Sequence, residues 1–523
     1  MDYKNKTNSI IIFLSLIIIS ITITYTYYFD HLAIAQSSII FNDEIYKDKT
    51  SLYYVINNNM PSFLFVIINF FLDSGVSINL TSSILTFIST FLYLSGIYLI
   101  TKFITASTIL SVLISSTAIF LSKNLGDIDY PTLMFHRHTA GVLSLALCTF
   151  IFGLMTLRNL SFAFLAAIFL LSIHLTIGMW IFGILSFISL ILVDKYNKKN
   201  IFFIIILLLL VILFYLNWFF NISADLPYKF DKNDYDDYFL YIEAHRTNYG
   251  NLNNLHLDYI LKSFFLIISI LIYAKFFENN FHKNIFFKTL ITSISLSGIL
   301  YFSYKFFPNI FPEIMIQTMP QRFFLLHTVV GYPIILSIVY KFLQKLFIDK
   351  KINKNYSVLL ITFIISFHII QQNDLVRERF KNIEEIKNSN NNEKIFWSKV
   401  KDLNIKGYAL TSNYLCEKTI IYGNLPILFC FEAMDYIALI PKLATPVKEM
   451  INKILDISYE NVKIRNTSGV SEKEIKIIYE KKSLTEWHTL KRDLNLDLII
   501  VPKDWKLQLD VVIDDIYKVY KIE

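Results

Sequence analysis

The sequence predicts an α-helical polytopic membrane protein with about eleven transmembrane helices, followed by a small α/β domain outside the membrane. Of its 523 residues, 54% are hydrophobic and only 17% are charged, which is more apolar surface than one soluble core can bury. Repeated apolar runs of roughly 18–22 residues match the length of helix that crosses a bilayer. After about residue 372 the composition changes to mixed polar and apolar. We therefore divide the chain into a multi-span domain at 1–372 and a second domain at 373–523.

Eleven hydrophobic segments account for the first domain. The first follows Lys4 and Lys6 and lacks a small-residue cleavage site, so it is expected to be a retained span and not a cleaved signal peptide. The predicted spans are 8–28, 79–101, 105–123, 139–157, 160–175, 177–193, 201–220, 258–276, 285–306, 325–346 and 355–372.

The distribution of Lys and Arg predicts the orientation. With the N-terminus in the cytoplasm, the short cytoplasmic loops hold most of the loop Lys and Arg residues, as the positive-inside rule requires. An odd number of spans then leaves the C-terminal domain outside an inner (plasma) membrane. The net charge of +7 is explained by these loops, so nucleic acid is not an expected partner.

The external loops at 29–78 and 221–257 are longer than the cytoplasmic ones. Within the first of them, Tyr53–Leu72 contains an apolar run that is short for a span and includes Pro61. A helix lying along the membrane surface fits this pattern, with lipids as its partners. Long polar loops on one membrane face are where a functional site is expected.

The C-terminal domain shows short strand-like runs separated by helical stretches. Helices are expected near 375–402, 446–456 and at Ser483–Asn495, the last beginning with a Ser-x-x-Glu capping motif. Strands are expected at Gly407–Thr411, Pro426–Cys430, Leu496–Val501 and Ile516–Ile522. The domain also holds Cys416 and Cys430, which in an extracytoplasmic location either form a disulfide or remain two free thiols.

Acidic residues of the first external loop are the candidates for catalysis. Asp43, Glu44 and Asp48 lie in the stretch Phe41–Asp48, between the first span and the interfacial segment. They either form a solvated acidic turn, or one of them deprotonates an acceptor hydroxyl while a neighbour positions it or binds a cation. Their place near lipid headgroups favours the second interpretation. The sequence leaves a divalent cation open and identifies no other cofactor.

Basic residues and histidines on the same predicted face are candidates for substrate binding. Arg137 is suited to hold a phosphate in fork geometry, with His136 and His138 in support, although the three also fit an interfacial cluster. His174, in the stretch SIHLTIGMW, lies in an otherwise apolar segment, where it either faces a cavity or makes a helix-packing hydrogen bond. The remaining candidates are His245, Arg246, Gln321 and Arg322.

Several common nucleotide-binding, redox and hydrolase motifs do not occur in the chain. We find no Walker motif, no GxGxxG after a strand, no CxxC pair and no GxSxG sequence. The sequence therefore does not indicate that this chain binds ATP or a nucleotide cofactor.

Four features occur together in this chain: the stretch FNDEIYKD after the first span, the interfacial segment, the short paired spans around SIHLTIGMW and the external C-terminal domain. In this combination the chain resembles the GT-C superfamily of membrane glycosyltransferases. These enzymes use polyprenyl-phosphate sugars and include protein O-mannosyltransferases and aminoarabinose transferases. Asp43-Glu44 resembles the acidic pair of the O-mannosyltransferases, although Asn42 interrupts the usual aromatic-Asp-Glu order, and Asp48 is a competing match. The resemblance implies a lipid-phosphate sugar donor, an inverting displacement and an acidic base near the outer membrane face.

The expected function is thus transfer of a sugar from a polyprenyl-phosphate donor to an extracytoplasmic glycan, lipid or protein acceptor. A transporter or lipid-glycan flippase without chemistry of its own is the alternative, and it would need charged residues deep in the spans. A third hypothesis is a non-catalytic assembly protein that binds a partner through its C-terminal domain.

Overall fold

The structure is a computed structural model of the chain. It describes residues 3–26, 31–47, 49, 51–125, 139–157, 160–192, 198–223, 254–277, 284–307, 323–351, 353, 355–371, 392–431, 440–457 and 470–523. Contacts between Cα atoms divide the chain into two compact units. The first unit comprises residues 1–30, 79–214 and 252–383, and the second comprises 31–78, 215–251 and 384–523.

Every stretch predicted to span the membrane contains a helix within the described residues, because a helix satisfies the backbone hydrogen bonds of a long apolar run internally. The helices are α1 (Tyr3–Thr26), α5 (Ile78–Thr105), α6 (Thr108–Leu125), α8 (Ala140–Thr156), α9 (Leu160–Ile173), α10 (Leu175–Leu192), α11 (Lys198–Asn217), α13 (Asn254–Phe277), α14 (Ile285–Phe306), α16 (Leu325–Asp349) and α17 (Asn355–Gln371). By length and composition, five of the described helices could cross a membrane, and a sixth crossing is added if one bent pair counts as a span. That all eleven cross stays a prediction.

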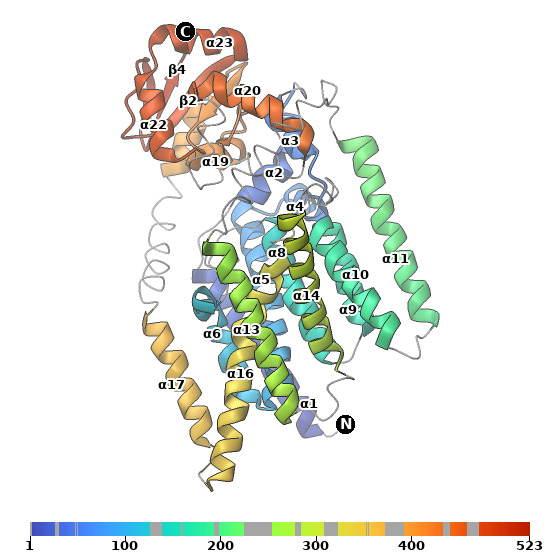
Figure 1. Cartoon of the computed structure of the whole chain (residues 1–523). Coiled ribbons are helices and arrows are strands. Elements are labelled where there is room, and N and C mark those ends of the chain that lie inside the picture. The colour runs from blue at the N-terminus through green and yellow to red at the C-terminus, as the bar shows by residue number, and fades with distance from the viewer. Residues whose placement is uncertain are drawn as a thin grey trace. The chain divides into compact units, whose positions relative to one another are not determined.

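Small residues let helices of the first unit approach closely. A Cβ atom on Gly96 of α5 would lie 2.4 Å from the carbonyl oxygen of Thr149 in α8, and one on Gly153 of α8 would lie 2.9 Å from the Cα of Gly96. Helices α9 and α10 run side by side as a hairpin (Figure 1). Gly178 is packed against the α9 backbone, since a Cβ there would lie 2.4 Å from the Cα of Leu171.

The second unit begins with three short helices of the first loop, α2 (Leu32–Phe41), α3 (Leu52–Asn58) and α4 (Phe63–Asp73). The hydroxyl of Ser37 donates to the carbonyl of Phe65 at 2.8 Å and joins α2 to α4. Helices α3 and α4 meet at 106°, across a break that contains Pro61. The single interfacial helix predicted at Tyr53–Leu72 is therefore divided in two, because proline removes a backbone donor and ends the first helix before it.

The C-terminal part of the second unit holds a four-stranded sheet in the order β1-β2-β4-β3. Its strands are β1 (Tyr408–Thr411), β2 (Leu496–Pro502), β3 (Val511–Asp514) and β4 (Tyr517–Lys521). Strands β1 and β2 are parallel, and the other two pairs are antiparallel. Figure 1 shows the strands β2 and β4 surrounded by helices of this region. The helices are a segment at 392–401, α19 (Cys416–Ile421), α20 (Ala444–Leu455), α22 (Glu472–Lys481) and α23 (Leu484–Leu494).

Three of the four predicted strands and the Ser-x-x-Glu helix start are confirmed. The side chain of Ser483 accepts from the backbone of Glu486, and Glu486 bonds back to the backbone of Ser483, which completes the capping box of α23. The strand predicted at Pro426–Cys430 is wrong: Ile427 forms only an isolated parallel bridge to Ala409.

Candidate functional site

Residues 42–47 form a tight turn after α2, called the acid turn below. The side chain of Asn42 accepts from the backbone N–H of Glu44 at 3.1 Å, which is the local bond that bends the chain. Ile45 and Tyr46 are 3% and 1% exposed, whereas Asp43 and Glu44 are exposed. The turn thus buries its apolar half and presents its carboxylates outward.

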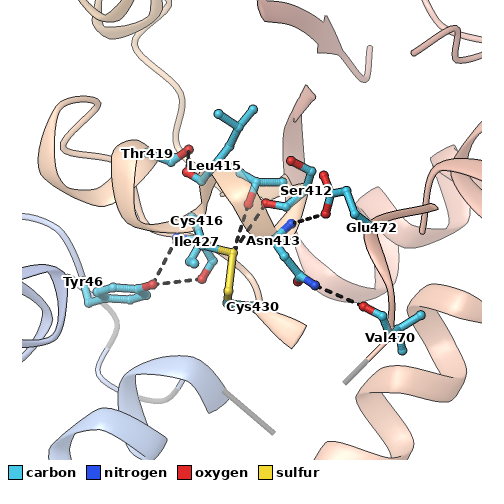
Figure 2. The surroundings of a disulfide bond; sticks show 11 residues. Tyr46, Ser412, Asn413, Leu415, Cys416, Thr419, Ile427, Cys430, Val470 and Glu472 are labelled. Carbon is cyan, nitrogen blue, oxygen red and sulfur yellow. Dashed lines mark hydrogen bonds between the residues drawn. A yellow bond between two sulfur atoms is a disulfide. The ribbon is translucent and has the colours of Figure 1, made fainter. Parts of the chain in front are cut away.

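Tyr46 holds the acid turn to the C-terminal part of the unit. Its hydroxyl donates to the carbonyl of Ile427 at 3.0 Å and accepts from the N–H of the same residue at 3.1 Å (Figure 2). Burial, with a smaller contribution from Tyr53, raises the pKa of Tyr46 well above its ordinary value. The hydroxyl therefore stays protonated and keeps both hydrogen bonds.

Asp43 forms an exposed ion pair with Lys49. The Lys49 Nζ lies 2.8 Å from the carboxylate. The side chain of Lys49 is 58% exposed and that of Asp43 is 76% exposed. The hydrogen bond that Lys49 donates to the Asp43 carboxylate raises the pKa of Lys49. An ion pair so open to water contributes little to stability, so the lysine can leave without a large cost when another group binds the carboxylate.

The segment that receives Tyr46 is closed by a disulfide between Cys416 and Cys430, whose Cα atoms are 6.1 Å apart. The structure thus resolves the two alternatives left by the sequence in favour of pairing. Residues 416–430, called the disulfide loop below, also receive Tyr53, whose ring meets that of Phe429 edge-on at 6.5 Å. Disulfides of this kind persist in oxidising compartments.

A partly buried polar network extends from the disulfide loop. Lys418 Nζ lies 2.5 Å from a Glu393 carboxylate oxygen and donates to the Tyr517 hydroxyl at 3.2 Å, while Tyr517 donates to Glu393 at 2.9 Å. The hydroxyl of Tyr422 lies 3.0 Å from Nε2 of His31, at the start of α2. These bonds satisfy charges that burial would otherwise penalise.

In the first unit, three helices share one polar cluster that the sequence did not lead us to expect. Ser293 of α14 lies 2.6 Å from Nε2 of His327 in α16, and Trp180 of α10 donates its indole N–H to the same hydroxyl at 3.0 Å. His327 and Ser293 are fully buried. The ring of Trp180 stacks on Phe323 with centroids 4.1 Å apart.

His174 occupies the junction of α9 and α10 and is partly exposed. Its Nδ1 accepts from the backbone N–H of Ile177 at 3.5 Å, and its carbonyl accepts from Gly178 at 2.9 Å. These bonds serve the first turn of α10, so His174 acts as a helix-start residue.

The structure brings some predicted stretches together and leaves others outside the described residues. The Trp180–Phe323 stack joins the end of SIHLTIGMW to the residue that follows Gln321 and Arg322. The candidates outside the described residues are Asp48, His136, Arg137, His138, His245, Arg246, Gln321 and Arg322.

The sequence did not predict the roles of two side chains, His327 and Tyr46. His327 interrupts an apolar run as His174 does, and that shared signal could have identified it. Tyr46 carries no such signal, because one tyrosine among 32 does not reveal a backbone partner far along the chain.

Among the described residues, no group of three or more His, Cys, Asp or Glu side chains is arranged to hold a metal ion. A comparison with models of known protein families finds no match, and a comparison with curated protein sequences finds none either. The GT-C resemblance therefore remains an expectation that experiments have to test.

Proposed function

We propose that the chain is a GT-C-like membrane glycosyltransferase that moves a sugar from a polyprenyl-phosphate donor to an extracytoplasmic acceptor. The observation that supports this best is the acid turn, which buries Tyr46 on a fixed backbone partner while it exposes Asp43 and Glu44. A carboxylate on a turn held in this way is oriented before the substrate arrives, as general base catalysis requires.

In the proposed reaction, one of Asp43, Glu44 or Asp48 takes the proton of an acceptor hydroxyl. The hydroxyl oxygen forms a bond to the anomeric carbon while the bond from that carbon to the phosphate oxygen breaks, so the configuration inverts. Polyprenyl phosphate leaves with the bonding electron pair. Arg137 and Arg322 are the proposed ligands of its phosphate, because a guanidinium binds two phosphate oxygens at once.

The proposed location is an inner membrane, with the N-terminus in the cytoplasm and the C-terminal domain on the outer side. The Cys416–Cys430 disulfide supports this placement of the C-terminal region. The predicted cytoplasmic loops, which are rich in Lys and Arg, support the same orientation.

The test is sugar transfer by the purified full chain in lipid nanodiscs, supplied with a panel of polyprenyl-phosphate sugars and an envelope extract as acceptor. Replacing the base by its amide, in Asp43→Asn, Glu44→Gln or Asp48→Asn, should lower the rate by about 100-fold or more in one variant. Asp73→Asn is the matched control, since Asp73 is an acid of the same loop that bonds Asn69 in its own helix. Unchanged transfer in the triple variant would refute the proposal.

A second candidate function, lipid-glycan transport without chemistry, is favoured by the Trp180–Ser293–His327 cluster. Buried polar side chains within apolar helices are costly and tend to mark transport pathways. If this alternative holds, Ser293→Ala and His327→Leu should stop movement of a fluorescent polyprenyl-phosphate sugar across vesicles, and the acid variants should not.

A further inference from the structure

Residues 31–53 of the first loop, which include the acid turn, make a series of contacts with the disulfide loop. Tyr46 bonds both polar groups of the Ile427 backbone, and Tyr53 packs on Phe429. On the N-terminal side of Tyr46, the Asn42 amide nitrogen donates to the Asn424 amide oxygen at 3.5 Å, and His31 bonds Tyr422. The first loop is therefore fitted residue by residue to one short segment.

That receiving segment is itself fixed on two sides. The N–H of Ala409 in β1 donates to the carbonyl of Pro426 at 2.8 Å, and the N–H of Leu428 donates back to the carbonyl of Ala409 at 2.8 Å. Cys430 then joins the segment to Cys416, the first residue of α19 (Figure 2). Because both sides are held, Ile427 presents its backbone to Tyr46 in one position.

The Tyr46 hydroxyl acts as both donor and acceptor toward the Ile427 backbone. It offers its proton to the Ile427 carbonyl and its lone pair to the Ile427 N–H, so one buried oxygen satisfies two backbone groups. Between Tyr46 and the acids lie only one or two residues of a turn. Any displacement of the Tyr46 backbone therefore moves Asp43 and Glu44.

We propose that Tyr46 is a positioning residue for the acid turn and that the disulfide loop is its receptor. Loss of the hydroxyl, or reduction of Cys416–Cys430, then releases the carboxylates from their working position. This inference rests on the proposed function for its kinetic consequence, whereas the docking itself is measurable without any activity.

The first experiment measures docking by hydrogen exchange on the full chain in nanodiscs. Tyr46→Phe keeps the ring, which lies 5.7 Å from that of Tyr54, and removes only the hydroxyl. Exchange in peptides covering residues 42–47 and 425–431 should rise together by about tenfold. The Cys416→Ala/Cys430→Ala double variant should also raise exchange in the 42–47 peptide.

Tyr520→Phe provides the matched control. The Tyr520 hydroxyl is likewise buried, donates to the carbonyl of Trp505 at 3.0 Å and accepts from the N–H of Leu507 at 3.3 Å. It thus loses the same two kinds of bond in the same unit, but away from the first loop. Exchange in the 42–47 peptide should not change in this variant.

The second experiment separates positioning from general stability by kinetics. Tyr46→Phe should lower kcat at least tenfold and leave the KM for the polyprenyl-phosphate sugar within twofold, because the acid acts only in the bond-forming step. Tyr520→Phe should leave both constants unchanged.

Each result decides one part of the inference. Unchanged exchange at 42–47 in Tyr46→Phe would overturn the docking role. Raised exchange with unchanged kcat, in a protein whose acid variants are inactive, would overturn positioning and leave the glycosyltransferase proposal standing. If instead the triple acid variant retains transfer, the proposed function fails, and the positioning role falls with it while the docking result still stands.

Discussion

Burial changes the acid–base behaviour of Tyr422 at the end of α19. Its hydroxyl lies against His31, and burial, with the nearby Glu393 carboxylate, raises its pKa to about 12. The folded chain therefore binds the phenolic proton more tightly than the unfolded chain, in which the pKa is the ordinary 10. The hydroxyl contributes fully to stability below pH 10 and loses that contribution as the pH rises toward 12.

We expect the free energy of unfolding of the wild-type chain to fall between pH 10 and 12 with a slope that Tyr422→Phe makes shallower by about 1 kcal/mol per pH unit. Chemical denaturation of the detergent-solubilised chain, followed by fluorescence at several pH values, measures the slope. Equal slopes for wild type and Tyr422→Phe would contradict the assignment.

At the scale of elements, the α9–α10 hairpin depends on one glycine. The backbone of α9 lies where a Gly178 side chain would begin, so the two short helices approach more closely than side chains normally permit. This close approach, with His174 at the junction, gives the hairpin its tight connection.

Gly178→Ala should therefore destabilise the chain by about 1–3 kcal/mol, because the added methyl group forces the helices apart. Gly183→Ala is the control on the same helix, since a Cβ there meets nothing within 4 Å. It should be neutral or slightly stabilising, as alanine is the better helix former. Thermal unfolding in detergent compares the two, and equal midpoints would show that the hairpin relaxes at no cost.

The elements that could be predicted are those whose own residues determine them. Apolar runs and the Ser483 capping motif were sufficient to predict the helices, because a helix satisfies its backbone hydrogen bonds internally. Strand β3 was missed, since it lies at the sheet edge with Val511 and Val512 44% and 42% exposed and shows no buried alternation. Pro426–Cys430 has a strand-like composition, but its Pro lacks a donor and its end is tied to Cys416.

At the scale of the whole chain, the second unit is assembled from separate stretches, with residues 31–78 grouped with the C-terminal region. Sequence analysis indicated the acid turn and the two cysteines as separate features. Their connection through Tyr46 could not be predicted, because a side chain that bonds a backbone group requires nothing of the partner's residue type.

The disulfide should stabilise this assembled unit. Closing a loop with a sequence separation of 14 lowers the conformational entropy of the unfolded chain, which stabilises the folded state by about 3 kcal/mol. A reducing agent should therefore lower the free energy of unfolding of the purified chain by about that amount, measured by denaturant titration. The same agent should not affect Cys416→Ala/Cys430→Ala, and an equal effect on that variant would point to another target.

The distance along the chain between Tyr46 and Ile427 also sets an order of events during synthesis. The two residues are 381 positions apart, and at roughly 5–20 residues per second the ribosome makes Ile427 roughly 20–75 s after Tyr46. During that interval Tyr46 lacks the backbone groups of Ile427 that its hydroxyl later bonds. The first loop is therefore exposed to chaperones and proteases until the C-terminal region emerges, and a chain that stops before residue 427 never shields it.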